Sequence, residues 1–142
     1  MPAVSRAVAL AVASLAIAGC GNNADPERSS RRATPPDQVV QQFLAAKRAA
    51  DGNRMCALYS ATYREELRDD PDNERHLSCE RLSESYARAF RDDDNRLRRV
   101  EISGDAAIAT VSCEDPSASD CSLPLVREDG RWRIAGSLSP ND

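Results

Sequence analysis

The chain has 142 residues, which is enough for one domain at most. Its formal net charge is −4, so it lacks the basic surface with which proteins neutralise nucleic-acid phosphates, and we expect no nucleic-acid partner. Aromatic residues make up only 4% of the sequence, so a small domain built from it needs another source of stability, and the cysteines are the obvious candidates.

Residues 1–20 follow the plan of a secretory signal peptide. Arg6 is the lone positive charge, and residues 7–18 are small or apolar apart from Ser14. This run is shorter than the about 20 residues that a membrane-spanning helix requires. The segment therefore predicts export from the cytoplasm.

The apolar run ends in Ile17-Ala18-Gly19-Cys20, which resembles the lipobox of bacterial lipoproteins. The resemblance implies that lipoprotein signal peptidase recognises Ile17, Ala18 and Gly19, cleaves before Cys20, and leaves Cys20 acylated. Two acyl chains are enough for stable anchoring. We therefore expect the mature protein on the extracytoplasmic face of the cell membrane, with membrane lipid as its partner through Cys20. An ordinary secretory peptide cut before a cysteine is the alternative.

The segment after Cys20 is expected to be a spacer. Residues 21–36 contain no aliphatic side chain larger than alanine, so they cannot bury enough apolar surface to offset their chain entropy. The chain is thus divided into a signal peptide at residues 1–19, a lipidated and disordered tether at residues 20–35, and a folded domain at residues 36–142.

The folded part begins with helical patterns. Thr34 is expected to cap the first helix, and Gly52 is expected to end it in a left-handed conformation. A second helix is predicted over about residues 53–67 and a third over about residues 77–91. The third is expected to carry an apolar face made of Cys79, Leu82, Tyr86, Ala89 and Phe90.

The apolar period then changes from that of a helix to that of a strand. Strands are predicted near residues 97–102, 107–111, 123–127 and 132–135, with turns at Gly104 and at Asp129-Gly130. Helices followed by antiparallel strands predict an α+β domain, with the helices packed on one face of the sheet.

The closing segment, residues 125–134 (LVREDGRWRI), resembles the last hairpin of NTF2-like (cystatin-like α+β) domains. Residues 36–138 follow the order of elements in these domains, and the chain looks most like small secreted lipoproteins of that superfamily whose activity is uncharacterised. The resemblance implies a cone formed by N-terminal helices on a curved antiparallel sheet. The sequence departs from the ligand-binding and catalytic members in one respect: its predicted sheet looks shorter, so a smaller interior is expected. Many functions share this fold, so the resemblance predicts no particular chemistry.

Four cysteines remain once Cys20 is assigned to lipid, and an even number outside the cytoplasm indicates disulfides. Cys113 and Cys121 flank a polar turn between two predicted strands. Cys56 and Cys79 are expected on the inner faces of the second and third helices. The expected pairs are therefore Cys56–Cys79 and Cys113–Cys121.

The sequence offers no convincing catalytic set. His76 is the only histidine, lies beside a charged loop and is expected at the surface. Paired carboxylates such as Glu65-Glu66 and Asp69-Asp70 lie among arginines, whereas acid–base catalysis needs a partly desolvated carboxylate. With one imidazole and no Cys-x-x-Cys motif, neither a metal nor another cofactor is expected.

Tyr59, Tyr63, Tyr86 and Trp132 are the candidates for lining a pocket inside the cone, the alternative being core side chains with satisfied polar groups. We expect a membrane-anchored, non-enzymatic binding or accessory domain at the cell envelope, whose partner is an envelope protein or a small apolar ligand. The alternative is an NTF2-like isomerase or dehydratase acting on a small apolar substrate, which would need a buried acid near a tyrosine. A structural module with a filled sheet face is the third hypothesis.

Overall fold

The computed structural model describes residues 33–73, 75–90, 94–115 and 118–141, so the predicted signal peptide, Cys20 and most of the tether lie outside it. The helices of the described part are α2 (Pro36–Arg48), α3 (Gly52–Leu58), α4 (Ala61–Asp69) and α5 (Cys79–Ala89). The strands are β1 (Leu97–Ser103), β2 (Ala106–Asp115), β3 (Ala118–Glu128), β4 (Arg131–Ile134) and β5 (Ser139–Pro140). None of the described helices is long and apolar enough to cross a membrane.

The strands form one antiparallel sheet in the order β1-β2-β3-β4, and the short β5 pairs with β3. Two tight turns connect its hairpins. Gly104 between β1 and β2 has a φ of 61°, and Asp129 and Gly130 between β3 and β4 have φ values of 49° and 74°. Glycine and aspartate adopt this left-handed region more readily than most residues. Both predicted turns are confirmed.

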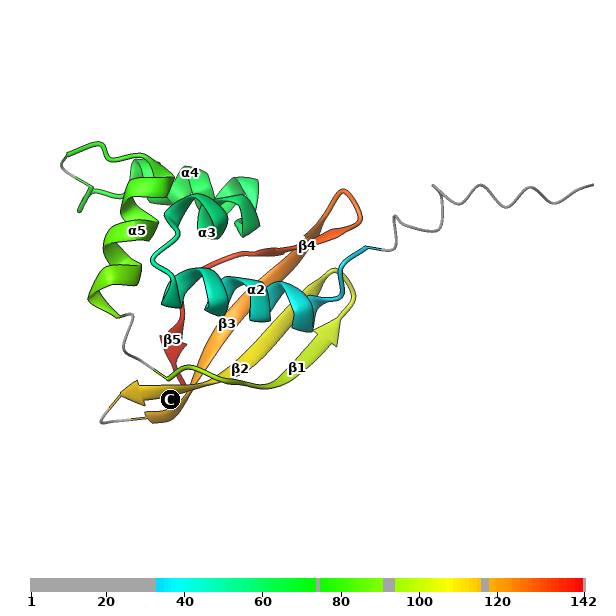
Figure 1. The fold of residues 1–142 in the computed structure, drawn as a ribbon. Helices are drawn as coiled ribbons and strands as arrows, with labels where there is room; N and C mark the ends of the chain where they lie inside the picture. The colour runs from blue at the N-terminus through cyan, green and yellow to red at the C-terminus, as the bar shows by residue number, and fades with distance from the viewer. Residues whose placement is uncertain (1–32, 74, 91–93, 116–117, 142) are drawn as a thin grey trace, which may run out of the picture. The chain divides into compact units, whose positions relative to one another are not determined.

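The hydrophobic core lies between α2 and the sheet, and α2 runs across one sheet face (Figure 1). Val40, Phe43 and Leu44 of α2 are buried. Alternate residues of the central strands, among them Ala109 of β2 and Leu123 of β3, are buried with them. Alternation of this kind puts one face of a sheet in the core. The predicted fold class, α+β with helices packed on a curved antiparallel sheet, is confirmed.

The second predicted helix is in fact two helices, α3 and α4, separated at Tyr59 and Ser60. The backbone N–H of Ser60 donates to the carbonyl of Ile134 at 2.8 Å, and Tyr59 forms a parallel bridge with Ile134. The Ser60 hydroxyl then accepts from the backbone N–H of Tyr63 at 3.0 Å and so caps α4. Pairing with β4 takes the backbone out of the helix, and the serine cap starts the next one.

Gly52 does not end α2 as predicted. It is the first residue of α3, and Ala50 takes the left-handed conformation with a φ of 50°. The glycine is needed for close packing instead, because an added Cβ would lie 2.0 Å from the carbonyl oxygen of Glu80 and 2.8 Å from the backbone nitrogen of Glu84. The backbones of α3 and α5 thus approach more closely than any side chain would permit.

This packing predicts that Gly52→Ala lowers the free energy of unfolding by about 1–3 kcal/mol, the usual penalty of forcing extra atoms into a well-packed site. Urea unfolding followed by circular dichroism measures the change. Asn53→Ala, at the exposed next position of α3, is the matched control, and its effect should stay within about 0.5 kcal/mol. Equal stability of the two variants would contradict the close approach of α3 and α5.

Two helix boundaries also differ from the prediction. Pro35, not Thr34, takes the N-cap position of α2, and no side chain caps the helix. Pro36 follows at the first helical position, where proline is tolerated because the N–H it lacks would have no partner within the helix and its φ is already restricted to helical values. α5 ends at Ala89, which is exposed, and the Phe90 ring, although 47% exposed, packs against Tyr86 with centroids 5.0 Å apart.

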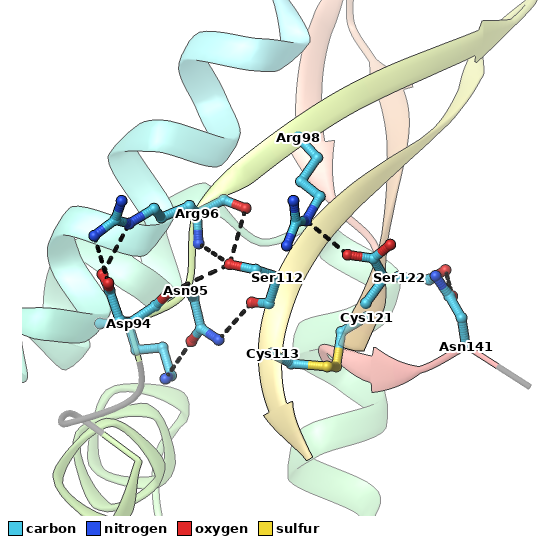
Figure 2. Close-up of a disulfide and its surroundings, with 11 residues drawn as sticks. Asp94, Asn95, Arg96, Arg98, Ser112, Cys113, Cys121, Ser122 and Asn141 are labelled. Carbon is cyan, nitrogen blue, oxygen red and sulfur yellow. Dashed lines mark hydrogen bonds and ion pairs between the residues drawn. A yellow bond between two sulfur atoms is a disulfide. The ribbon is translucent and has the colours of Figure 1, made fainter. Parts of the chain in front are cut away.

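Both predicted disulfides are present. Cys56 of α3 pairs with Cys79 of α5 across a Cα–Cα distance of 5.9 Å, and Cys113 of β2 pairs with Cys121 of β3 across 5.7 Å. Both distances lie within the usual range of about 4.4–6.8 Å. The first bond joins two helices and the second closes the β2–β3 hairpin, where Figure 2 shows it beside residues 94–96. The predicted pairing is confirmed.

Lys47 of α2 is the only lysine of the chain, and its side chain is buried, with 1% exposed. Its Nζ donates to the carbonyl of Phe90 at 2.5 Å and to Oδ1 of Asn95 at 2.7 Å. Asn95, also buried, donates through Nδ2 to the carbonyl of Ser112 at 2.9 Å (Figure 2). Lys47 therefore ties α2 to the end of α5 and, through Asn95, to β2.

Candidate functional site

A cavity of about 430 Å³ lies among the helices and the segment that follows β4. Its walls come from α2, the α3–α4 junction, α4, α5 and residues 136–138. Ligand pockets of proteins commonly measure about 300–1,000 Å³. The residues that line it are Phe43, Tyr59, Tyr63, Glu66, Leu67, Asp70, Leu82, Ser83, Tyr86, Gly136, Ser137 and Leu138. We refer to it as the tyrosine pocket.

Aromatic rings form much of the wall. The rings of Tyr59 and Tyr63 meet edge to face, with centroids 5.0 Å apart and planes at 69°. Phe43 of α2 packs on the other side of Tyr59 at 6.2 Å. Such pairs stabilise one another beyond the burial of their surface and hold the rings in fixed orientations. The pocket therefore has a preformed aromatic corner.

The tyrosine hydroxyls are the polar groups at this corner. The Ser83 hydroxyl donates to the Tyr59 hydroxyl at 3.4 Å, and both residues are buried. Burial raises the pKa of Tyr59 above its ordinary value. Burial, helped by the nearby Tyr59, Tyr86 and Glu66 side chains, raises the pKa of Tyr63 to about 12. Both hydroxyls therefore stay neutral at physiological pH and can donate a hydrogen bond to a ligand.

Two carboxylates lie at the rim. Glu66 on α4 and Asp70 just after it line the pocket, and both side chains are exposed. One Asp70 oxygen already accepts from the backbone N–H of Asp72 at 2.8 Å. A general acid or base needs a carboxylate held in a partly desolvated site. Neither acid meets that requirement.

The pocket does not lie where the resemblance placed it. Its lining includes no residue of β1, β2, β3 or β4 among those described, because the face of the sheet beneath α2 is covered by core side chains. The space is found instead at the helical end of the domain, next to the backbone that leaves β4. The expected small interior of the cone is thus filled, and the usable cavity is displaced from it.

Three of the candidate pocket residues, Tyr59, Tyr63 and Tyr86, are brought together in this cavity. Trp132 is not among its described lining residues. It lies on β4 opposite Arg127, whose guanidinium carbon is 4.8 Å from the centre of the indole ring, and its side chain is 5% exposed. The β4 register turns Trp132 toward the core, and the Arg127 guanidinium lies over the indole ring.

Several lining residues were missed by the sequence reasoning. Phe43 and Leu82 belong to predicted apolar helix faces, and that pattern could have suggested them. Ser137 and Leu138 follow the last predicted strand and carry no motif, yet they close one wall. Ser137 hydrogen-bonds with the Tyr63 side chain. Only the folded chain brings them next to the tyrosines.

His76 is exposed and does not line the tyrosine pocket. Within the described ranges, no group of three or more His, Cys, Asp or Glu side chains is placed to hold a metal ion.

No protein-family model matches the sequence, and no curated protein sequence does so either. Several solved structures have a similar fold. A proposed NTF2-like transpeptidase from Campylobacter jejuni is 16% identical, over 73% of this chain and 100% of that chain, with a TM-score of 0.49. An NTF2-like protein of unknown function from Shewanella baltica is 18% identical, over 73% of this chain and 90% of that chain, with a TM-score of 0.46.

A proposed dehydratase of the NTF2-like family from Streptomyces avermitilis is 17% identical, over 75% of this chain and 99% of that chain, with a TM-score of 0.41. All three structures bear the NTF2-like name, the one to which the last hairpin of this sequence pointed. The likeness concerns the arrangement of helices and strands and carries no activity.

Proposed function

We propose that this chain is an exported, lipid-anchored protein whose domain binds a small, largely apolar ligand in the tyrosine pocket, without catalysis. The observation that carries the proposal is the cavity of about 430 Å³ walled by aromatic and aliphatic side chains. Sites for small molecules are typically concave, mostly apolar and equipped with a few polar groups that orient the ligand. The hydroxyls of Tyr59 and Tyr63 are such groups.

The position of the acids supports binding over catalysis. An isomerase or dehydratase would need a carboxylate buried against the substrate, near a tyrosine. Glu66 and Asp70 are instead exposed at the rim. The buried polar groups of the pocket are hydroxyls, which orient a ligand but are weak bases at neutral pH.

The predicted anchor supports a role at the cell envelope. The lipobox-like Ile17-Ala18-Gly19-Cys20 precedes a polar segment without aliphatic side chains larger than alanine, and the folded domain contains two disulfides. Disulfides persist in oxidising compartments outside the cytoplasm. A tethered domain with a preformed pocket suits the capture of a ligand near the membrane surface.

Fluorescence titration with the neutral apolar dye N-phenyl-1-naphthylamine tests the binding. The mature chain carrying Cys20→Ser is used, because lipid and detergent would take up the dye. We expect saturable binding at one site. Leu82→Trp fills the pocket from α5 and should weaken binding at least about tenfold. Leu138→Trp should do the same from the segment that follows β4, provided that circular dichroism shows both variants folded.

Ile102→Trp is the matched control, since it adds a similar ring at a position that is 57% exposed and does not line the pocket. Its dye affinity should equal that of the unsubstituted chain. A chain that does not bind the dye, or filled variants that bind as well as this control, would contradict the proposed function.

A further inference from the structure

The charged residues that line the tyrosine pocket are all acidic in the described part of the chain. Glu66 and Asp70 are the acidic side chains among its described lining residues, and none of those residues is lysine or arginine. Glu66 lies close enough to the Tyr63 hydroxyl to disfavour its ionisation. A bound anion would therefore meet repulsion at the rim, whereas a cation would be attracted there.

The aromatic corner adds a second attraction for a cation. The face of a tyrosine ring carries partial negative charge, and a cation within about 6 Å of the ring centre is attracted to it. Tyr59 and Tyr63, with centroids 5.0 Å apart and planes at 69°, present rings in two orientations around one corner. A cation that enters the pocket therefore meets aromatic side chains at this corner.

Lys47 determines which rings are available. Its Nζ lies 5.9 Å from the centre of the Tyr86 ring. The lysine is not a lining residue, and its ammonium donates to Phe90 and Asn95 inside the protein. One aromatic wall of the pocket is thus already used by an internal cation. Recognition of a ligand cation is left to Tyr59 and Tyr63.

We propose that the ligand of the tyrosine pocket is a small organic cation, with a quaternary or tertiary ammonium group on a short apolar body. The ammonium group lies against Tyr59 and Tyr63, with the carboxylates of Glu66 and Asp70 at the rim. The inference rests on the proposed function, since it names the chemical class of the ligand for the same site.

Isothermal titration calorimetry with choline and with its neutral isostere 3,3-dimethylbutan-1-ol tests the charge directly. The two molecules have nearly the same shape and differ by the charge. On the Cys20→Ser mature chain, choline should bind at least about tenfold more tightly than the alcohol. Equal affinities would overturn the cation inference.

Single substitutions test whether the side chains of Tyr63 and Glu66 contribute to choline binding. Tyr63→Leu, which removes both ring and hydroxyl, should weaken choline binding about fivefold or more, and Tyr63→Phe, which keeps the ring, should weaken it clearly less than Tyr63→Leu does. Glu66→Gln should weaken choline about threefold and leave the alcohol unchanged. Glu65→Gln, the exposed neighbour on α4 that does not line the pocket, is the control and should change neither. Loss of choline binding in Glu65→Gln as large as in Glu66→Gln would contradict the assignment.

The two proposals fail separately. If the neutral naphthylamine binds and is lost in the filled variants but choline shows no preference over its isostere, the pocket is a ligand site and the cation inference is wrong. If neither the naphthylamine nor choline binds the folded chain, both proposals are wrong.

Discussion

Replacing Cys56 and Cys79 together by alanine is expected to lower the free energy of unfolding by about 3.5 kcal/mol. The bond closes a loop with a sequence separation of 23 residues, so its loss releases much chain entropy in the unfolded state. Small domains have a net stability of only about 5–15 kcal/mol. Urea unfolding of the two proteins, followed by circular dichroism, gives the difference.

The second disulfide provides the comparison. Cys113 and Cys121 are separated by only 8 residues, and the double alanine variant should lose about 2.5 kcal/mol. Removing the disulfide between α3 and α5 should therefore lower the free energy of unfolding more than removing the one in the β2–β3 hairpin. The reverse order, or no loss in either variant, would show that the disulfides contribute little to holding this domain together.

Lys47→Met is expected to lower the free energy of unfolding by about 2–4 kcal/mol. Methionine has a similar volume, but it leaves the carbonyl of Phe90 and Oδ1 of Asn95 without the donor that Lys47 gives them. Each buried acceptor left unsatisfied is destabilising by about 1–3 kcal/mol. Relief from burying a charge offsets part of this loss. Thermal and urea unfolding both report the change.

Arg48→Met is the matched control for Lys47→Met. Arg48 is the next residue of α2 and is exposed, so its variant should stay within about 0.5 kcal/mol of the unsubstituted protein. If Lys47→Met unfolds at the same urea concentration as Arg48→Met, the buried lysine is not the connection between α2, α5 and β2 that its hydrogen bonds indicate.

The features that could be predicted from the sequence have local signals. Asp129-Gly130 between two apolar runs predicts a hairpin because these residues accept positive φ values, and both do so here. Cys113 and Cys121 flank a short turn, so their pairing follows from the hairpin. The α+β order follows from the change of apolar period, which needs no knowledge of distant contacts.

The features that could not be predicted depend on contacts between distant residues. The break between α3 and α4 arises because the backbone N–H of Ser60 donates to the carbonyl of Ile134 in β4, and no local sequence pattern predicts that hydrogen bond. Gly52 looks like a helix stop in the sequence, whereas its role is to admit the backbone of α5. Lys47 reaches partners 43 and 48 positions away, so its burial has no signature in α2 itself.

The candidate site could be predicted only in part, because its walls also come from segments that are distant from one another in the sequence. Tyr59 and Tyr63 fall within the second predicted helix and were candidates for the interior as aromatic side chains, and they do line the pocket. Trp132 was grouped with them because it is large and aromatic, but the register of β4 turns it to the core. Ser137 and Leu138 complete the wall from a segment without a motif.

The placement of the protein on the membrane is the claim on which its proposed role depends, and fractionation of expressing cells tests it most directly. The full-length chain should be recovered in the membrane fraction, require detergent for release, and have the mass of a lipidated chain that begins at Cys20. The Cys20→Ser variant should appear in the soluble extracytoplasmic fraction. Recovery of the unsubstituted chain in the cytosol with residues 1–19 still attached would contradict the account.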